Sequence, residues 1–242
     1  MGGGHGRGPG LARRPRRAAV RDRGRALSPL PGDVLRFWFA DLDADGRWDR
    51  DHARRWFRGE PSFDALARAR FGEALVGLRE GAAWAERWRE TTRGRLALIL
   101  LGDQIARNVY RGQAEAFALD PLALALALEL VDSGAHLELH PIEQLFAYLP
   151  LEHTEDLATI DVCVGLLVDL ATRAPAADHG YFRQFVRYAL KHREVVARFG
   201  RYPHRNAALG RSSTPEELDY LRDGGETFGF TAPGGSSAGD RG

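Results

Sequence analysis

The sequence has 242 residues, of which 44% are hydrophobic and 28% are charged, and its formal net charge is +1. This nearly balanced charge excludes a strongly basic polyanion-binding protein, so we expect no nucleic-acid partner. A single cysteine, Cys163, excludes an internal disulfide and a zinc site built from several cysteines.

Residues 1–31 are rich in Gly, Arg and Pro and are predicted to be a disordered leader. Between positions 7 and 25 the segment contains eight arginines and one acidic residue, Asp22. The alternative to a disordered leader is therefore a basic arm that binds an anionic partner. The segment lacks the apolar stretch of a secretory signal. No stretch of the chain approaches the roughly 20 apolar residues that span a bilayer. We therefore expect a cytoplasmic protein without a membrane span.

Apolar residues recur with the helical period through most of the remaining chain, and strand-like alternation hardly occurs. Capping residues precede the predicted helices, and glycines such as Gly81 and Gly200 end them. Pro150 is predicted to end one helix, and Thr154 to cap the next. The predicted helices are 34–39, 52–57, 63–80, 93–108, 121–134, 141–149, 155–172, 181–199 and 216–222.

About eight helices with short connections predict an all-α fold, in which helix pairs stack as a solenoid or form an irregular bundle. No clean 34-residue repeat is visible, so a regular repeat array is not supported. We expect a single all-α domain over residues 32–230. The tail 231–242 is predicted to be disordered, and Phe228 and Phe230 are predicted to fold back onto the core.

The helix predicted over 93–108 carries the first polar motif. Residues 96–101 are apolar on all sides, which is typical of a fully buried helix, but the last turn is polar. Asp103 and Arg107 are four residues apart and share one face, and Asn108 follows. Buried charges must be paired to avoid a cost of several kcal/mol. The turn is therefore either an internal ion-pair network or the lining of a polar pocket.

The second polar motif occupies residues 148–155. Glu152 and His153 lie in a short connection after Pro150, where a carboxylate beside an imidazole suits acid–base chemistry or metal ligation. Glu155 follows Thr154 in the predicted first turn of the next helix. A carboxylate there is explained by the helix dipole alone.

The third polar motif follows the helix 181–199. Its functional candidates are Arg201, His204, Arg205, Asn206 and Arg211. The helix dipole accounts for a cation near the helix end but not for all of these. Guanidinium groups bind carboxylate or phosphate through paired N–H donors, so the partners are either internal carboxylates or an external anion.

His192 lies on the apolar face of the same helix, close in sequence to the third motif. A histidine on such a face is either a buried core residue with its hydrogen bonds satisfied or a member of the pocket. We include His192 among the candidate pocket residues.

These motifs resemble those of a known family. Residues 98–108 (LILLGDQIARN), 148–155 (YLPLEHTE) and 199–206 (FGRYPHRN), followed by 209–211 (LGR), are similar to segments of the bacterial domain-of-unknown-function family 924. The chain departs from that pattern at Gly102 and at Ile105-Ala106, where the family usually has leucine and Phe-Pro. The resemblance implies a multihelical fold similar to tetratricopeptide-repeat proteins, and it implies no established activity.

The sequence lacks the strong enzymatic signatures, such as a phosphate-binding loop, a nucleophile elbow or a His-Glu-x-x-His motif. Whether the protein is an enzyme therefore stays open. Our first hypothesis is a pocket for a small anionic ligand or an acidic peptide, with no cofactor and no metal. A second is a hydrolase that uses Glu152, His153 and His204 as acid, base or metal ligands, and a third is a purely structural ion-pair network. The predicted lining residues are Asp103, Arg107, Asn108, Glu152, His153, Glu155, His192, Arg201, His204, Arg205, Asn206 and Arg211.

Overall fold

The computed structural model of this chain describes residues 1–2, 29–43 and 46–229, and every regular element in these ranges is helical. The all-α prediction is thus confirmed for this part of the chain. Most of the predicted leader and the whole predicted tail lie outside the described residues. The helices are α1 (Pro31–Phe39), α2 (Arg50–Ala53), α3 (Arg55–Arg58), α4 (Pro61–Arg79), α5 (Ala83–Arg89), α6 (Thr92–Ile99), η1 (Leu100–Ile105), α7 (Ala106–Val109), η2 (Ala114–Phe117), α8 (Asp120–Asp132), η3 (Ala135–Glu138), α9 (Pro141–Glu152), α10 (Leu157–Arg173), η4 (Ala176–Asp178), α11 (His179–Phe199), η5 (Pro203–Arg205) and α12 (Pro215–Arg222).

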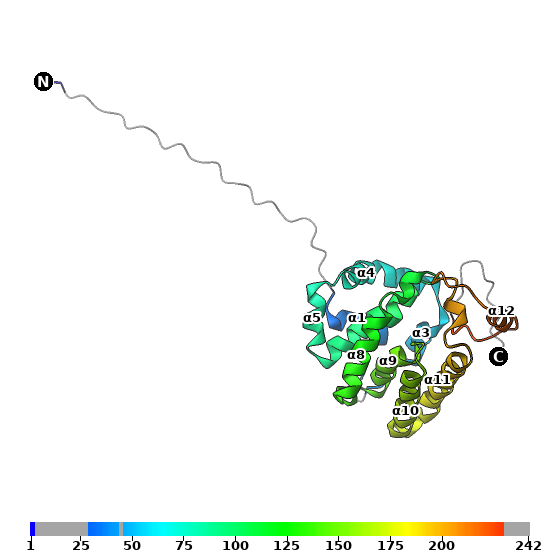
Figure 1. Ribbon diagram of the computed structural model, residues 1–242. Helices are drawn as coiled ribbons and strands as arrows, with labels where there is room; N and C mark the ends of the chain where they lie inside the picture. Colours follow the sequence, from blue (N-terminus) through cyan, green and yellow to red (C-terminus); the bar gives the residue numbers. More distant parts are fainter. Residues whose placement is uncertain (3–28, 44–45, 230–242) are drawn as a thin grey trace.

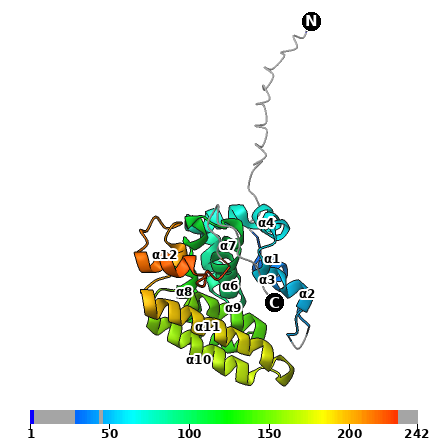
Figure 2. The same cartoon turned by 90° about the vertical axis from the view of Figure 1, so that its right-hand side faces the viewer.

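The longer helices pack on their neighbours in sequence. Helix α8 packs on α6 and α9, α9 packs on α10, and α10 packs on α11. Figure 1 shows these helices side by side, with α5 and α12 at opposite ends, and Figure 2 shows α10 and α11 as a layer of the bundle. This arrangement is an irregular helical bundle, and it is consistent with stacked helix pairs. Within the described ranges, no helix has the length and apolar character needed to cross a bilayer.

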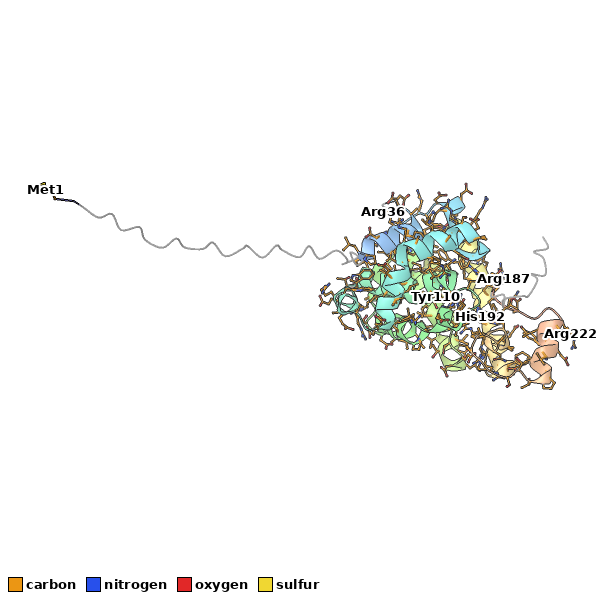
Figure 3. The ribbon with its side chains drawn as sticks, turned by 90° about the horizontal axis from the view of Figure 1, so that it is seen from above. Met1, Arg36, Tyr110, Arg187, His192 and Arg222 are labelled. Carbon is orange, nitrogen blue, oxygen red and sulfur yellow. The ribbon has the colours of Figure 1, made fainter. Side chains whose placement is uncertain are left out.

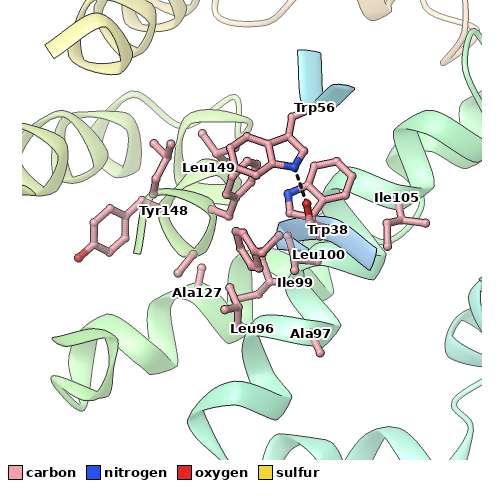
Figure 4. Close-up of a cluster of buried hydrophobic side chains, with 14 of the residues drawn as sticks. Trp38, Trp56, Leu96, Ala97, Ile99, Leu100, Ile105, Ala127, Tyr148 and Leu149 are labelled. Atoms are coloured by element: carbon pink, nitrogen blue, oxygen red, sulfur yellow. Dashed lines mark hydrogen bonds between the residues drawn. The ribbon is translucent and has the colours of Figure 1, made fainter. Parts of the chain in front are cut away.

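The core forms where α1, α6 and α9 meet (Figure 4). The ring of Trp38 packs edge-on against Phe146 with centroids 5.5 Å apart, and the Trp56 indole N–H donates to the Trp38 carbonyl oxygen at 2.6 Å. Residues 96–101 are all buried, as their unbroken apolar character predicts. Burial of this many large side chains stabilises the bundle and fixes the positions of α6 and α9, which both lead into the polar motifs.

The helix predicted over 93–108 is divided in the structure. It begins as α6, widens into the π-helical segment η1, and resumes as α7. A π turn holds more residues than an α turn and therefore rotates the later side chains about the helix axis; such turns are frequent at functional sites. Here it places Asp103 and Gln104 in the interior, where Asp103 is fully buried and Gln104 is 6% exposed.

Two predicted boundaries near the second motif are wrong. Pro150 lies inside α9, which continues to Glu152; a proline so close to the helix end removes only one N–H from the last turns. The cap of α10 is Asp156, which accepts from the Thr159 N–H at 2.8 Å, rather than Thr154. Glu155 therefore lies in the connection and not in a helical turn, so its carboxylate is available for a distant partner.

Candidate functional site

Residues of all three polar motifs meet where η1, the end of α9, α11 and η5 come together. His153 Nδ1 lies 2.7 Å from Asp103 Oδ1, and Arg205 Nη1 donates to the His153 carbonyl oxygen at 2.9 Å. Glu152 Oε1 lies 3.8 Å from Nδ1 of His192, which Figure 3 labels on α11. We call this group the polar centre. Its members are Asp103, Arg107, Asp120, Glu152, His153, His192, His204 and Arg205.

Asp103 is the deepest charge of the polar centre. Arg107 Nη1 lies 2.9 Å from Asp103 Oδ1, and the same guanidinium contacts Asp120 at 3.0 Å. Burial alone would raise the pKa of Asp103, but the charge of Arg107 and the hydrogen bond with His153 hold that pKa well below its usual range. Asp103 is therefore ionised, and its charge is balanced within the protein.

Glu152 and His153 are neighbours with different environments. Glu152 is 4% exposed, and its buried Oε2 has no hydrogen-bond partner in the described part of the chain. Burial, together with the charge of Asp103, raises the pKa of Glu152 to about 8. Burial lowers the pKa of His153, whose Nδ1 faces Asp103 and whose Nε2 lies 3.9 Å from Glu152 Oε1. An Nδ1–H donated to Asp103 leaves the Nε2 lone pair directed toward Glu152.

His192 lies against the other side of Glu152. Its ring stacks on Phe228 with centroids 3.6 Å apart, and its Nδ1 lies 2.9 Å from the Tyr188 carbonyl oxygen. Burial lowers the pKa of His192 well below its ordinary value, and nearby cationic groups add to this effect. The prediction that Phe228 folds back onto the core is confirmed by this contact, whereas Phe230 lies outside the described residues.

Arg205 is a buried cation, 7% exposed, at the edge of the polar centre. Its guanidinium carbon lies 4.4 Å from the ring centroid of Tyr202 and 4.8 Å from that of Phe117. Its Nη1 is 3.5 Å from Asp120 Oδ2, and its buried Nε makes no hydrogen bond to any residue within the described ranges. Burial lowers the pKa of the adjacent His204 to about 3, and the Arg205 charge contributes to that shift.

Other arginines of the third motif have internal partners. Arg201 binds Glu217 with both Nε and Nη2, at 2.6 and 2.8 Å. Arg211 binds Glu155 at 2.6 and 2.8 Å, and its Nε donates to the Asn206 side-chain oxygen at 3.0 Å. These pairs join η5, the α9–α10 connection and α12. Arg205, in contrast, has no such close paired contact with a carboxylate among the described residues; its ion pair with Asp120 is 3.5 Å long.

Not every predicted site residue joins the polar centre. Asn108 donates to Asp64 of α4 at 2.6 Å, in a separate contact between α4 and α7. Conversely, Asp120 and Tyr202, which are not among the predicted lining residues, contact members of the polar centre. Asp120 is the first residue of α8, and its carboxylate also binds Arg107. The Tyr202 hydroxyl donates to the Glu152 carbonyl oxygen.

Most members of the polar centre are buried, and several contact one another directly. Cavities of about 360 and 340 Å³ lie beside Trp48 and beside Tyr220, and neither is lined by a member of the polar centre. The charges meet instead in direct contact with one another. A ligand of this site must therefore be small, or it must displace a covering side chain such as Phe228.

The pair of Arg201 and Glu217 gives a pH-dependent prediction. Hydrogen bonds from Arg201 lower the pKa of Glu217 to about 2, so the pair contributes stability above the unfolded-state pKa of about 4.3 and loses it as pH falls toward 2. Arg201 is partly exposed, and solvent screens the pair. Glu217→Gln should therefore lower the unfolding free energy at pH 7 by about 1–2 kcal/mol.

Urea unfolding of Glu217→Gln and of the wild type at pH 7 and pH 3 measures this effect. The difference between the two proteins should shrink at pH 3. Glu216→Gln is the matched control, because Glu216 is exposed on the same helix and its pair with Arg198 should contribute less than about 1 kcal/mol. A Glu217 effect that is equal at both pH values would contradict the assignment.

Comparison with known proteins places these features in context. The model of a family described as "Bacterial protein of unknown function (DUF924)" matches residues 34–225. A solved structure, that of the protein of unknown function ATU0120 from Agrobacterium tumefaciens, is similar at 32% sequence identity with a TM-score of 0.65. The similarity covers 80% of this chain and 97% of that one. No curated protein matches the sequence.

Proposed function

The chain belongs to the DUF924 family of bacterial proteins, and we propose that its polar centre binds a small anionic ligand, a phosphate or carboxylate group, through Arg205. The observation that carries this proposal is the buried Nε of Arg205, which has no hydrogen-bond partner among the residues that the structure describes. A buried donor without a partner costs about 1–3 kcal/mol, and more on a charged group. An anion placed at this edge of the guanidinium removes that cost.

Charge balance around Arg205 supports the same proposal. The nearest carboxylate, Asp120, is shared with Arg107 and is closer to Arg107, at 3.0 Å, than to Arg205, at 3.5 Å. The aromatic rings of Phe117 and Tyr202 hold the guanidinium but offer only cation–π contacts. Arg205 is therefore positioned by its neighbours without being fully neutralised. Because it is buried, a small ligand suits it better than the surface of a folded partner.

A thermal-shift titration with inorganic phosphate and acetate tests the proposal, with chloride at matched ionic strength as reference. At a ligand concentration 100 times Kd, binding stabilises the native state by about 2.7 kcal/mol. For a chain of this size that is a rise in Tm of roughly 5–10 °C. Arg205→Lys, which keeps the charge but removes the planar fork and Nε–H, should abolish the rise.

Arg201→Lys is the matched control, because Arg201 already pairs with Glu217 and should keep the full response to phosphate. Equal responses of Arg205→Lys and the wild type would refute the role of Arg205. Destabilisation of Arg205→Lys with no response of the wild type to either anion would favour the structural ion-pair network instead. The cytoplasmic location and the domain boundaries remain predictions of the sequence.

A further inference from the structure

Two imidazoles and a carboxylate converge inside the polar centre. Glu152, His153 and His192 each offer one ligand atom, and these three atoms lie within 4.8 Å of one another. Glu152 ends α9, His153 follows it directly, and His192 comes from α11, so the packing of α11 against α9 and α10 completes the group. His204, which the sequence analysis grouped with Glu152 and His153, is not a member of this trio.

We propose that Glu152, His153 and His192 form a binding site for a divalent transition-metal ion of the zinc type. Neutral imidazole nitrogen and carboxylate oxygen are ligands of zinc, and two histidines with one glutamate leave a further coordination position open. This proposal departs from the sequence expectation of no metal. It does not depend on anion binding by Arg205.

The surroundings of His153 resemble the outer shell of a metal site. Metal-bound imidazoles usually donate their second N–H to a carboxylate or a backbone carbonyl, which fixes the tautomer and the ring orientation. His153 Nδ1 lies 2.7 Å from the Asp103 carboxylate, and His192 Nδ1 lies 2.9 Å from the Tyr188 carbonyl oxygen. With a proton on Nδ1, His153 keeps an Nε2 lone pair for a metal. His192 faces Glu152 with Nδ1, the same nitrogen that lies near the Tyr188 carbonyl oxygen, so metal binding requires either that Nδ1 leaves this carbonyl or that the ring turns to present Nε2.

The third ligand, Glu152, has a buried carboxyl oxygen whose hydrogen-bonding capacity is not satisfied by any described residue. Its Oε2 is buried and makes no hydrogen bond to any described residue. Its Oε1 lies near both histidines, 3.9 Å from His153 Nε2 and 3.8 Å from His192 Nδ1, distances too long for hydrogen bonds. A buried carboxylate that is close to two imidazoles but bonded to neither is suited to a cation between them.

The geometry sets a requirement on binding. With bonds of about 2.0–2.1 Å, neighbouring ligand atoms of tetrahedral zinc lie roughly 3.3–3.4 Å apart. The three side chains must therefore move together by up to about 1 Å on binding. Phe228 stacks on the His192 ring, so metal entry includes a shift of this contact. The open position would take water or an anion. The hydrolase hypothesis names acid, base and metal ligands but no nucleophile, and a zinc-bound water would supply one.

The test uses the full chain without a polyhistidine tag, after removal of metal with a chelator. Zn²⁺ is titrated in competition with a chromogenic chelator, and Co²⁺ absorption reports the coordination geometry. We expect one Zn²⁺ per chain and a tetrahedral Co²⁺ spectrum. Glu152→Gln and His192→Ala should each weaken zinc binding about 100-fold or more. His179→Ala, the same substitution at the start of the same helix, should bind zinc as the wild type does.

Absence of stoichiometric zinc binding by the wild type, or wild-type zinc affinity in both ligand variants, would overturn the proposal. Circular dichroism checks that the variants fold. If they do not, zinc-edge anomalous diffraction from wild-type crystals decides: a peak between the three side chains supports the site, whereas a peak elsewhere or none refutes it. Phosphate titrations of the metal-free protein keep this result separate from the anion proposal.

Discussion

Asp103→Asn is expected to lower the free energy of unfolding by about 3–5 kcal/mol, because it removes one partner from a fully buried network. The amide keeps the shape of the carboxylate but not its charge. Asp120 would then be the carboxylate left to pair with Arg107, and His153 would lose the charged acceptor of its Nδ1. Urea unfolding at pH 7 measures the loss.

Asp169→Asn is the matched control for this substitution. Asp169 pairs with Arg173 four residues later on α10, but both side chains are substantially exposed. Exposed pairs of this kind contribute about 0.3–0.5 kcal/mol. The folded pKa of Asp103 is lowered, so its charge contributes stability above the unfolded-state pKa of about 3.9 and loses it as pH falls below that value. A loss of less than about 1 kcal/mol at pH 7 would show that this charge is not needed for stability.

Gly94→Ala is expected to destabilise the fold by about 3 kcal/mol or more, or to prevent folding. Gly94 is the third residue of α6, and its N–H donates to the side chain of the capping residue Thr91. A Cβ at this position would overlap the carbonyl oxygen of Trp88 at the end of α5 and lie 2.7 Å from Thr91 Oγ1. Both helices would have to shift, and overpacking against backbone exceeds the usual cost of about 1–3 kcal/mol.

Gly165→Ala is the control for the glycine substitution. Gly165 lies in α10, and beyond the backbone of its own helix turn and its chain neighbours no described atom lies within 4 Å of the place that a Cβ would take. Alanine has the higher helix propensity, so this variant should be more stable than the wild type by about 0.5–1 kcal/mol. Thermal melts of the two variants should thus move in opposite directions. A Gly94→Ala protein as stable as the wild type would contradict the close packing of α5 on α6.

The Asp103 and zinc predictions bear on each other. Asp103 both pairs with Arg107 and orients His153, so Asp103→Asn should weaken zinc binding by about 10- to 100-fold if the variant folds. A purely structural network predicts a loss of stability with no metal or anion response in any variant. Measurement of stability, zinc affinity and phosphate response on the same proteins therefore separates the three hypotheses raised by the sequence.

Much of the fold was predictable from local patterns. The unbroken apolar run 96–101, the glycine stop at Gly200 and the helix predicted over 216–222 correspond to a buried helix, a left-handed cap and α12. The errors fell where neighbouring signals compete. Pro150 is tolerated within α9, and Asp156 rather than Thr154 provides the cap of α10.

The sequence also identified the residue types of the candidate site, because charged residues next to fully apolar helices must find partners. It could not decide which partners. His192 and His204 are equally plausible companions of Glu152 along the chain, yet His192 is the one placed beside it. Likewise, Arg201 and Arg211 pair with Glu217 and Glu155, and these contacts depend on how α12 and the α9–α10 connection pack.

The sequence by itself thus determined the helical class, most helix positions and the polar segments that need compensation. These properties follow from periodicity, capping and the cost of buried charge, which act over a few residues. The tertiary structure alone decided the π turn that buries Asp103, the pairing of the arginines, and the approach of α11 that brings His192 to Glu152. Those outcomes depend on contacts between segments tens of residues apart, and the energies of such contacts cannot be predicted from local sequence patterns.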